Sequence, residues 1–260
     1  MTVIREGLII AERDLRHWRR QPWTPVLNLA FTIVLLVMFA VILGGSIRLP
    51  GGGDYISYLL PGMLAVTMLF GLEATMTAMA TDAKRGVTDR FRSLPIAAPS
   101  VALGRVGADM TTTVVELAVL CAGGFAIGWR ISGSAGAAVL AVALLLWLRL
   151  AMLWLGIYLA LTLGRAEGAA MAVQALVWPA GFLSTAFVSP EFMPGWLGWL
   201  SSANPLSATA TAVRGLFGNP TGVTSGWLAE HAVLGAVLWP AVLMAVFVPL
   251  SARAYRRLRR

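Results

Sequence analysis

Six apolar runs divide this chain, and each is close to the length that a helix needs to cross a membrane. Roughly 20 apolar residues cover the ~30 Å of hydrocarbon in a bilayer. The predicted spans are 25–45, 57–80, 108–128, 137–163, 168–188 and 228–250. The sequence therefore predicts an all-α polytopic membrane protein, with a single transmembrane domain over residues 1–260.

The composition excludes several other classes of protein. Hydrophobic residues make up 58% of the chain and charged residues 12%, whereas soluble domains carry about 25% charged residues. The net charge of +8 suits an anionic membrane surface better than nucleic acid, because apolar runs separate the basic residues. The single cysteine, Cys121, lies within an apolar run, so neither a disulfide within the chain nor a cysteine metal cluster is expected.

Fifteen of the twenty basic residues lie in three blocks: Arg5 to Arg20, Lys84 to Arg105, and Arg253 to Arg260. With six spans, all three blocks fall on the same side of the membrane, and the loops on the other side carry one basic residue each. Positive charge collects on the cytoplasmic side. We therefore expect a multi-pass protein of the plasma (inner) membrane with both termini in the cytoplasm.

The segment 1–22, before the first span, is predicted to form an amphipathic interfacial helix. Its apolar residues recur at helical spacing: Ile4, Leu8, Ala11, Leu15 and Trp18. Charged residues occupy the remaining positions, as in helices that lie on a membrane surface. The alternative is a plain topogenic anchor. The first span is too long for a cleaved signal peptide.

The loop 189–227 has helical signals of its own. Ser189, Pro190 and Glu191 are typical of a helix start. Trp196 and Trp199 then share a helical face, and Asn204-Pro205 ends that helix; a second short helix is expected up to Phe217. Because tryptophan is abundant and charge is scarce, we expect these helices to be re-entrant or interfacial in the outer leaflet. The alternative is a loop that packs on the bundle.

The second loop, 81–107, is predicted to contain a short cytoplasmic helix. Val87, Phe91 and Leu94 form an apolar stripe at i, i+4 and i+7. The charged residues around the stripe are Lys84, Arg85, Asp89, Arg90 and Arg92. Such an element suits docking into a groove on a soluble protein, although a charged loop that serves only topology has the same composition.

The stretch TDAKRGVTDRFRSLPI, from Thr81 to Ile96, resembles the cytoplasmic loop of ABC-2 type transporter permeases. The stretch from Leu103 to Asp109 continues the likeness. In the fifth loop the matching stretches are Ser184 to Val188, Pro190-Glu191, Met193 to Leu197, and Asn204 to Leu206. The likeness covers nearly the whole chain and is greatest to the daunorubicin-resistance-type drug and lipid export permeases.

This resemblance implies an ABC-2 (type V exporter-like) fold in which two permeases pair as a homodimer or a related heterodimer. Each permease would bind a cytosolic ABC ATP-binding subunit through a coupling helix at Lys84 to Leu94. The chain lacks the GxxxxGK[ST] phosphate loop, so ATP and Mg would bind to the partner and the permease itself would be no enzyme. The implied cargo is a hydrophobic or amphiphilic small molecule exported outward; the alternative is a polysaccharide or glycolipid.

Three charged residues lie inside the predicted spans: Glu73, Glu116 and Arg149. Each would cost about 2.5–3.5 kcal/mol in hydrocarbon, so each is expected to face protein or water. Helix lengths place all three in the inner half of the bilayer, and we expect Arg149 to pair with Glu116 or Glu73. Alternatively, an unpaired acid lines the cargo path. No nucleophile or metal motif accompanies these residues, which argues against a membrane-embedded enzyme.

Overall fold

The computed structural model describes residues 23–44, 54–84, 98–163 and 168–258, and the regular structure in these ranges is helical. The long helices are α2 (Trp23–Gly44), α3 (Tyr55–Lys84), α5 (Ala98–Ala126), α6 (Ala135–Leu163), α7 (Ala169–Phe182) and α10 (Trp227–Leu258). The short ones are η1 (Pro190–Phe192), α8 (Gly195–Ala203) and α9 (Pro205–Phe217). The predicted N-terminal helix, 1–22, lies outside the described residues.

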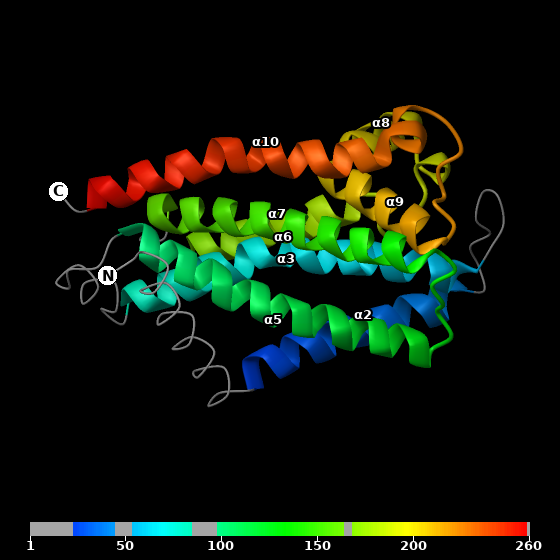
Figure 1. Cartoon of the computed structure of the whole chain (residues 1–260), viewed down its shortest axis with the longest axis horizontal. Coiled ribbons are helices and arrows are strands. Elements are labelled where there is room, and N and C mark those ends of the chain that lie inside the picture. Colours follow the sequence, from blue (N-terminus) through cyan, green and yellow to red (C-terminus); the bar gives the residue numbers. More distant parts are fainter. Residues whose placement is uncertain (1–22, 45–53, 85–97, 164–167, 259–260) are drawn as a thin grey trace.

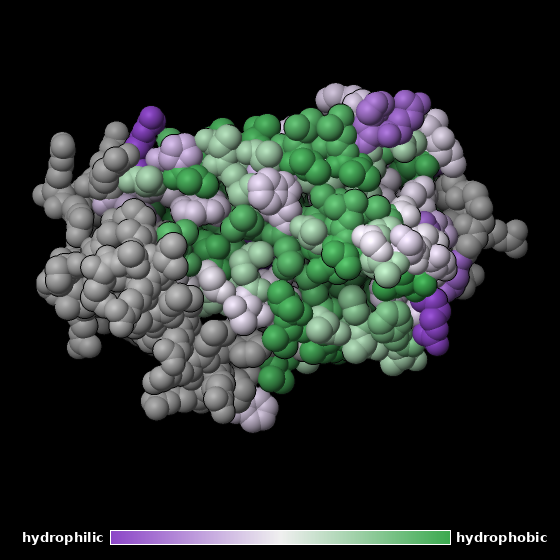
Figure 2. All heavy atoms as spheres, viewed as in Figure 1, coloured by the Kyte–Doolittle hydropathy of each residue, from purple (hydrophilic) through white to green (hydrophobic). Residues whose placement is uncertain are grey.

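The long helices lie alongside one another (Figure 1). At one end of the bundle are α8 and α9; at the other, which we call the loop end, α3 and α10 end and α5 begins. In the part of the chain described, four helices are long and apolar enough to cross a membrane: α3, α5, α6 and α10. The apolar stretches Ala30–Ile42 and Ala169–Phe182 are shorter, so the count of six spans stays a prediction. Figure 2 shows apolar residues across the middle of one face and hydrophilic residues toward the ends.

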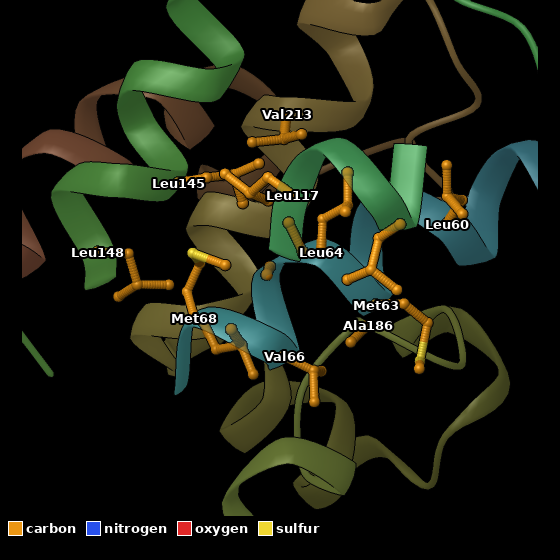
Figure 3. Close-up of a cluster of buried hydrophobic side chains, with 14 of the residues drawn as sticks. Leu60, Met63, Leu64, Val66, Met68, Leu117, Leu145, Leu148, Ala186 and Val213 are labelled. Carbon is orange, nitrogen blue, oxygen red and sulfur yellow. The ribbon is translucent and has the colours of Figure 1, made fainter. Parts of the chain in front are cut away.

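Helix α3 forms the centre of the bundle. Its sequence is apolar on every side, as expected for a helix enclosed by others, and it packs against α2, α5, α6, α7 and α9. Figure 3 shows side chains of α3 meeting those of its neighbours: Leu60, Met63, Leu64, Val66, Met68, Leu117, Leu145, Leu148, Ala186 and Val213. Any movement of α3 therefore requires its neighbours to repack.

Hydrogen bonds close the bundle at the end opposite the loop end. The buried indole of Trp129 donates to the Asn219 side chain at 2.9 Å, and the Asn219 amide donates to the Arg130 carbonyl at 3.0 Å. The predicted end of the second short helix is confirmed, because Gly218 takes the left-handed conformation (φ 71°) that terminates α9. These bonds attach the end of α9 to the turn between α5 and α6.

Candidate functional site

Arg149 of α6 lies in the middle of the bundle with 3% of its surface exposed. Its Nε donates to Asp109 Oδ2 at 2.8 Å and its Nη2 donates to Asp109 Oδ1 at 3.1 Å. Its Nη1 donates to the backbone carbonyl of Thr67 at 3.1 Å. This bidentate geometry is the strongest form of arginine–carboxylate pair. One side chain thus joins α6 to α5 and α3.

Gly71 of α3 makes room for this guanidinium group. A Cβ built at Gly71 would lie 2.4 Å from Arg149 Nε and 2.5 Å from Cζ, closer than atoms can approach. Gly71 follows Thr67 by one helical turn, so its missing side chain also opens the Thr67 carbonyl to a donor from another helix. The position therefore requires glycine as long as Arg149 stays in place.

A second buried arginine, Arg214 of α9, contacts α3 nearer the end of the bundle that lies opposite the loop end. Its Nε donates to the Tyr58 carbonyl at 2.8 Å, and its Nη2 donates to the Thr185 and Ala186 carbonyls at 3.0 and 2.9 Å. Its Cζ lies 3.5 Å from the centre of the Tyr58 ring, a cation–π contact. Burial lowers the pKa of Arg214, and the neighbouring Tyr58 opposes that shift.

Arg149 and Arg214 contact α3 in the same way, through a hydrogen bond to a backbone carbonyl. Each donates to a carbonyl that lies four residues before a glycine: Tyr58 before Gly62, and Thr67 before Gly71. A Cβ at Gly62 would lie 2.6 Å from Arg214 Nη2. Nine residues separate the two glycines, which corresponds to about 14 Å and half a turn of rotation. Helix α3 is therefore held from opposite sides at two levels.

The predicted partners of Arg149 were wrong. Its carboxylate partner is Asp109, not Glu116 or Glu73. The error has a physical cause: the third span was predicted to begin at residue 108, whereas α5 begins ten residues earlier, with Pro99 in its first turn, where proline is tolerated. Since α5 begins at Ala98, Asp109 lies about 16 Å into the helix rather than at its end.

The two glutamates also lie at different levels from those predicted. Glu116 is seven residues beyond Asp109, about 10 Å further from the loop end. Glu73 is six residues beyond Thr67, about 9 Å nearer the loop end. Glu73 also follows Leu69 by one turn, on the face of α3 toward Gly181 of α7. The structure therefore does not bring Glu73 and Glu116 together.

Lys84, the first residue of the predicted coupling helix, ends α3; Arg85 to Leu94 lie outside the described residues. The helices on either side of this segment are joined at the loop end, where Arg105 Nη1 of α5 lies 3.5 Å from Asp82 Oδ2 of α3. A force on the segment would therefore reach α3 and α5 together.

The predicted start at Ser189 and the predicted ends at Asn204 and Phe217 agree with the structure, but the first predicted helix is interrupted at Met193 and Pro194, which divide it into η1 and α8. Ser189 caps η1, with Pro190 first and Glu191 in the first turn. Asn204 ends α8 and caps α9: its side-chain oxygen accepts from the Leu206 amide at 2.9 Å, and its Nδ2 donates to the Ala180 and Leu183 carbonyls. Pro205 is the first residue of α9. Trp196 and Trp199 point away from the protein, 71% and 74% exposed.

Comparison with known proteins decides the family. The ABC-2 type transporter family matches residues 6–217. The chain belongs to this family. It is also 32% identical, over 225 residues, to the daunorubicin resistance ABC transporter permease protein DrrB1 of Streptomyces coeruleorubidus, covering 86% of this chain and 76% of that one. Members of this family are the membrane permease subunits of ABC transporters and are not themselves catalytic, and membership implies ABC ATP-binding partner subunits.

The sequence did not single out all the polar residues that this ABC-2 permease buries. In the sequence, Asp109 was noted only at the end of the stretch from Leu103 that resembles the family, and not as the partner of Arg149. Arg214 is the one basic residue of the predicted loop 189–227 and was counted there only for topology, yet it is fully buried. Gly62 and Gly71 carry no chemistry, although a glycine inside a strongly apolar helix is a usable signal of close approach. Among the described residues, no His, Cys, Asp or Glu cluster could hold a metal ion.

Proposed function

We propose that this permease exports a hydrophobic or amphiphilic small molecule, driven by ATP hydrolysis in a separate subunit. The observation that carries the proposal is the likeness to a daunorubicin resistance permease over most of the chain. The apolar bundle supports this cargo class: the space between its helices is filled by aliphatic and aromatic side chains. A polysaccharide or glycolipid cargo is the alternative, with no observation that favours it.

The ATP-binding subunit, with its ATP and Mg, is proposed to dock on Lys84–Leu94. The Asp82–Arg105 pair supports this site, because it joins the helices that enter and leave the segment. Arg149 and Arg214 contact α3 from opposite sides. These contacts support a bundle whose helices move together. A second permease would complete the transporter, and the six spans would place both termini in the cytoplasm.

The exposed face of α8 is proposed to lie in the outer membrane interface. Trp196, Trp199 and Leu200 are exposed, whereas Gly198 and Ser201 face the protein and are buried. Indole rings favour the level of the lipid headgroups, where their apolar body and N–H are both satisfied. A helix with its large apolar side chains directed outward is poorly suited to water.

Copurification tests the docking site and the partner together. The chain is expressed together with an ABC ATP-binding subunit from the same source. The triple variant Arg90→Glu, Phe91→Asp, Arg92→Glu is expected to lose that subunit while still reaching the membrane. The matched control reverses charge in another basic block, with Arg253→Glu and Arg256→Glu. Intact assembly in the triple variant would exclude docking through this segment.

Transport is measured in vesicles that contain the assembled complex. Uptake of a fluorescent amphiphilic dye into inside-out vesicles is expected to require ATP and to disappear when the ATP-binding subunit is inactivated. Export of a labelled glycolipid, without dye transport, would favour the alternative cargo.

A further inference from the structure

A line of aromatic side chains runs between α2, α3 and α7. Phe70 of α3 lies 4.9 Å from Trp178 of α7, ring centre to ring centre, and Phe31 of α2 meets the same indole at 5.9 Å. Trp178 stacks on Phe182 at 6.0 Å, and Phe182 stacks on Phe187 at 4.9 Å. These rings are not sealed in the core, because Phe31 and Phe182 are 50% and 48% exposed. An apolar molecule dissolved in the bilayer can therefore reach this aromatic line.

The contacts between α3 and α7 fix the relative position of the two helices. Trp178 meets Phe70, whereas Gly181, three residues further along α7, lies beside Val66 and Leu69 of α3. Residue numbers that rise along α7 fall along α3, so the two helices run in opposite directions. Since α3 ends at the loop end, the residues after Phe70 and those before Trp178 both lie toward the loop end.

Two polar side chains lie at the end of the aromatic line that is nearer the loop end. Glu73 follows Phe70 by three residues and Gln174 precedes Trp178 by four, so each shares a helix face with a ring that touches the other helix. From the Phe70–Trp178 contact, Glu73 and Gln174 are displaced by about 4.5 and 6 Å in the same direction. The two residues therefore lie at nearly the same level, on facing sides of α3 and α7.

Glu73 has no partner among the residues that the structure describes. Its carboxylate accepts no hydrogen bond from them and forms no ion pair with them. It is half-buried and lies about 16 Å before the end of α3 at Lys84, well inside an apolar helix. An unpaired carboxylate at such a depth is costly and marks a functional site. Gln174, which is exposed, adds a hydrogen-bonding group at the same level.

We propose that Glu73 and Gln174 bind the cationic head of an aromatic amphiphile whose rings lie along the aromatic line. A carboxylate supplies the opposite charge, the Gln174 carbonyl oxygen accepts a hydrogen bond, and the nearby ring faces attract a cation. This inference rests on the proposed function, because it names the charge of the exported cargo. A neutral amphiphile can use the rings but gains nothing from Glu73, so the site favours cations.

The first test measures binding to the permease alone, without an ATP-binding subunit. The protein is placed in nanodiscs of zwitterionic phosphatidylcholine, and fluorescence anisotropy is followed with ethidium, a flat aromatic cation, and with Nile red, a neutral dye. Glu73→Gln is expected to weaken ethidium binding at least tenfold, as for loss of a charge-assisted contact, and to leave Nile red binding within about twofold. Glu73→Asp is expected to retain part of the affinity for ethidium.

Glu116→Gln is the matched control, because Glu116 is also a half-buried glutamate of a membrane helix but lies outside the proposed site. It is expected to bind ethidium as the unaltered permease does. Unchanged ethidium binding in Glu73→Gln, an equal loss in Glu116→Gln, or no saturable ethidium binding to the unaltered permease would each overturn the inference.

Two further measurements separate binding from a structural role. Glu73→Gln is expected to melt no lower than the unaltered permease, since it removes a charge that has no partner in the protein; a clear fall in melting temperature would show that the carboxylate is a structural partner and would contradict the site. Trp178→Leu is expected to weaken binding of both dyes, because both lie on the rings. Unchanged binding of both dyes would exclude the aromatic line from the site.

Transport by the assembled complex distinguishes this inference from the proposed function. ATP-driven uptake of ethidium into inside-out vesicles is expected to fall at least fivefold in Glu73→Gln at a subsaturating dye concentration. Normal uptake in that variant would overturn the cation site while leaving the proposed function intact. Saturable ethidium binding without ATP-driven uptake by the unaltered complex would instead support the site and count against the proposed function.

Discussion

Replacement of Gly71 by alanine tests the central contact of this permease with one methyl group. The new Cβ would stand 2.4 to 2.6 Å from Nε, Cζ and Cδ of Arg149. Contacts of this length cannot persist, and Arg149 is too deeply buried to swing into solvent. The guanidinium must therefore leave Asp109, Thr67 or both.

The expected loss of stability follows from these contacts. Overpacking a core costs about 1–3 kcal/mol, and loss of one partner from a buried ion pair costs about 3–5 kcal/mol. We expect Gly71→Ala to destabilise the permease by about 3 kcal/mol, because the pair is displaced rather than deleted. The assay is thermal unfolding of the purified permease in detergent.

Gly181→Ala is the matched control. It adds the same methyl group to a buried glycine of α7, where the nearest side-chain atoms, from Val66 and Leu69, would be 3.8 and 3.9 Å away. That variant is expected to be neutral or slightly stabilised, since alanine favours helix over glycine by up to about 1 kcal/mol. If Gly71→Ala melts no lower than Gly181→Ala, Arg149 does not occupy the position described.

Two further changes test the end of the bundle near α8 and α9. Arg214→Gln removes the contacts with the Tyr58, Thr185 and Ala186 carbonyls and should destabilise the permease by about 3 kcal/mol, whereas Arg130→Gln, at an exposed arginine, should leave the melting temperature nearly unchanged. Asn204→Asp keeps an acceptor for the Leu206 amide but loses the donor to α7; it should melt between wild type and Asn204→Ala, which also loses the helix cap, worth about 1 kcal/mol. A wild-type melting temperature for Asn204→Asp would mean that the contact with α7 adds nothing, and equal melting temperatures for the two Asn204 variants would mean that the helix cap adds nothing.

The sequence predicts what depends on neighbouring residues. Ser189, Asn204-Pro205 and Gly218 act within a few residues of their own position, and each begins or ends a helix as expected. Helix position along the chain is likewise a local property of apolar runs. These predictions hold because the chemistry of a cap or a turn is complete within a short peptide.

The arginine contacts depend on distant residues and were less predictable. Asp109 is 40 residues from Arg149, and only the true start of α5 shows that the two reach the same level. Arg214 binds backbone carbonyls, which every residue carries, so no side-chain pattern could identify its acceptors. Composition alone could show that buried charges need partners, but not which partners they have.

The contacts of α3 also bear on the order in which the protein is made. Every acceptor for Arg149 and Arg214 stands earlier in the chain than the arginine that uses it, by as much as 156 residues for Tyr58. As the ribosome delivers the chain from its N-terminus, each arginine reaches the membrane when its acceptors are already synthesised. Helix α3 can thus serve as a template during biogenesis, and neither cation needs to wait in lipid for a partner still to be translated.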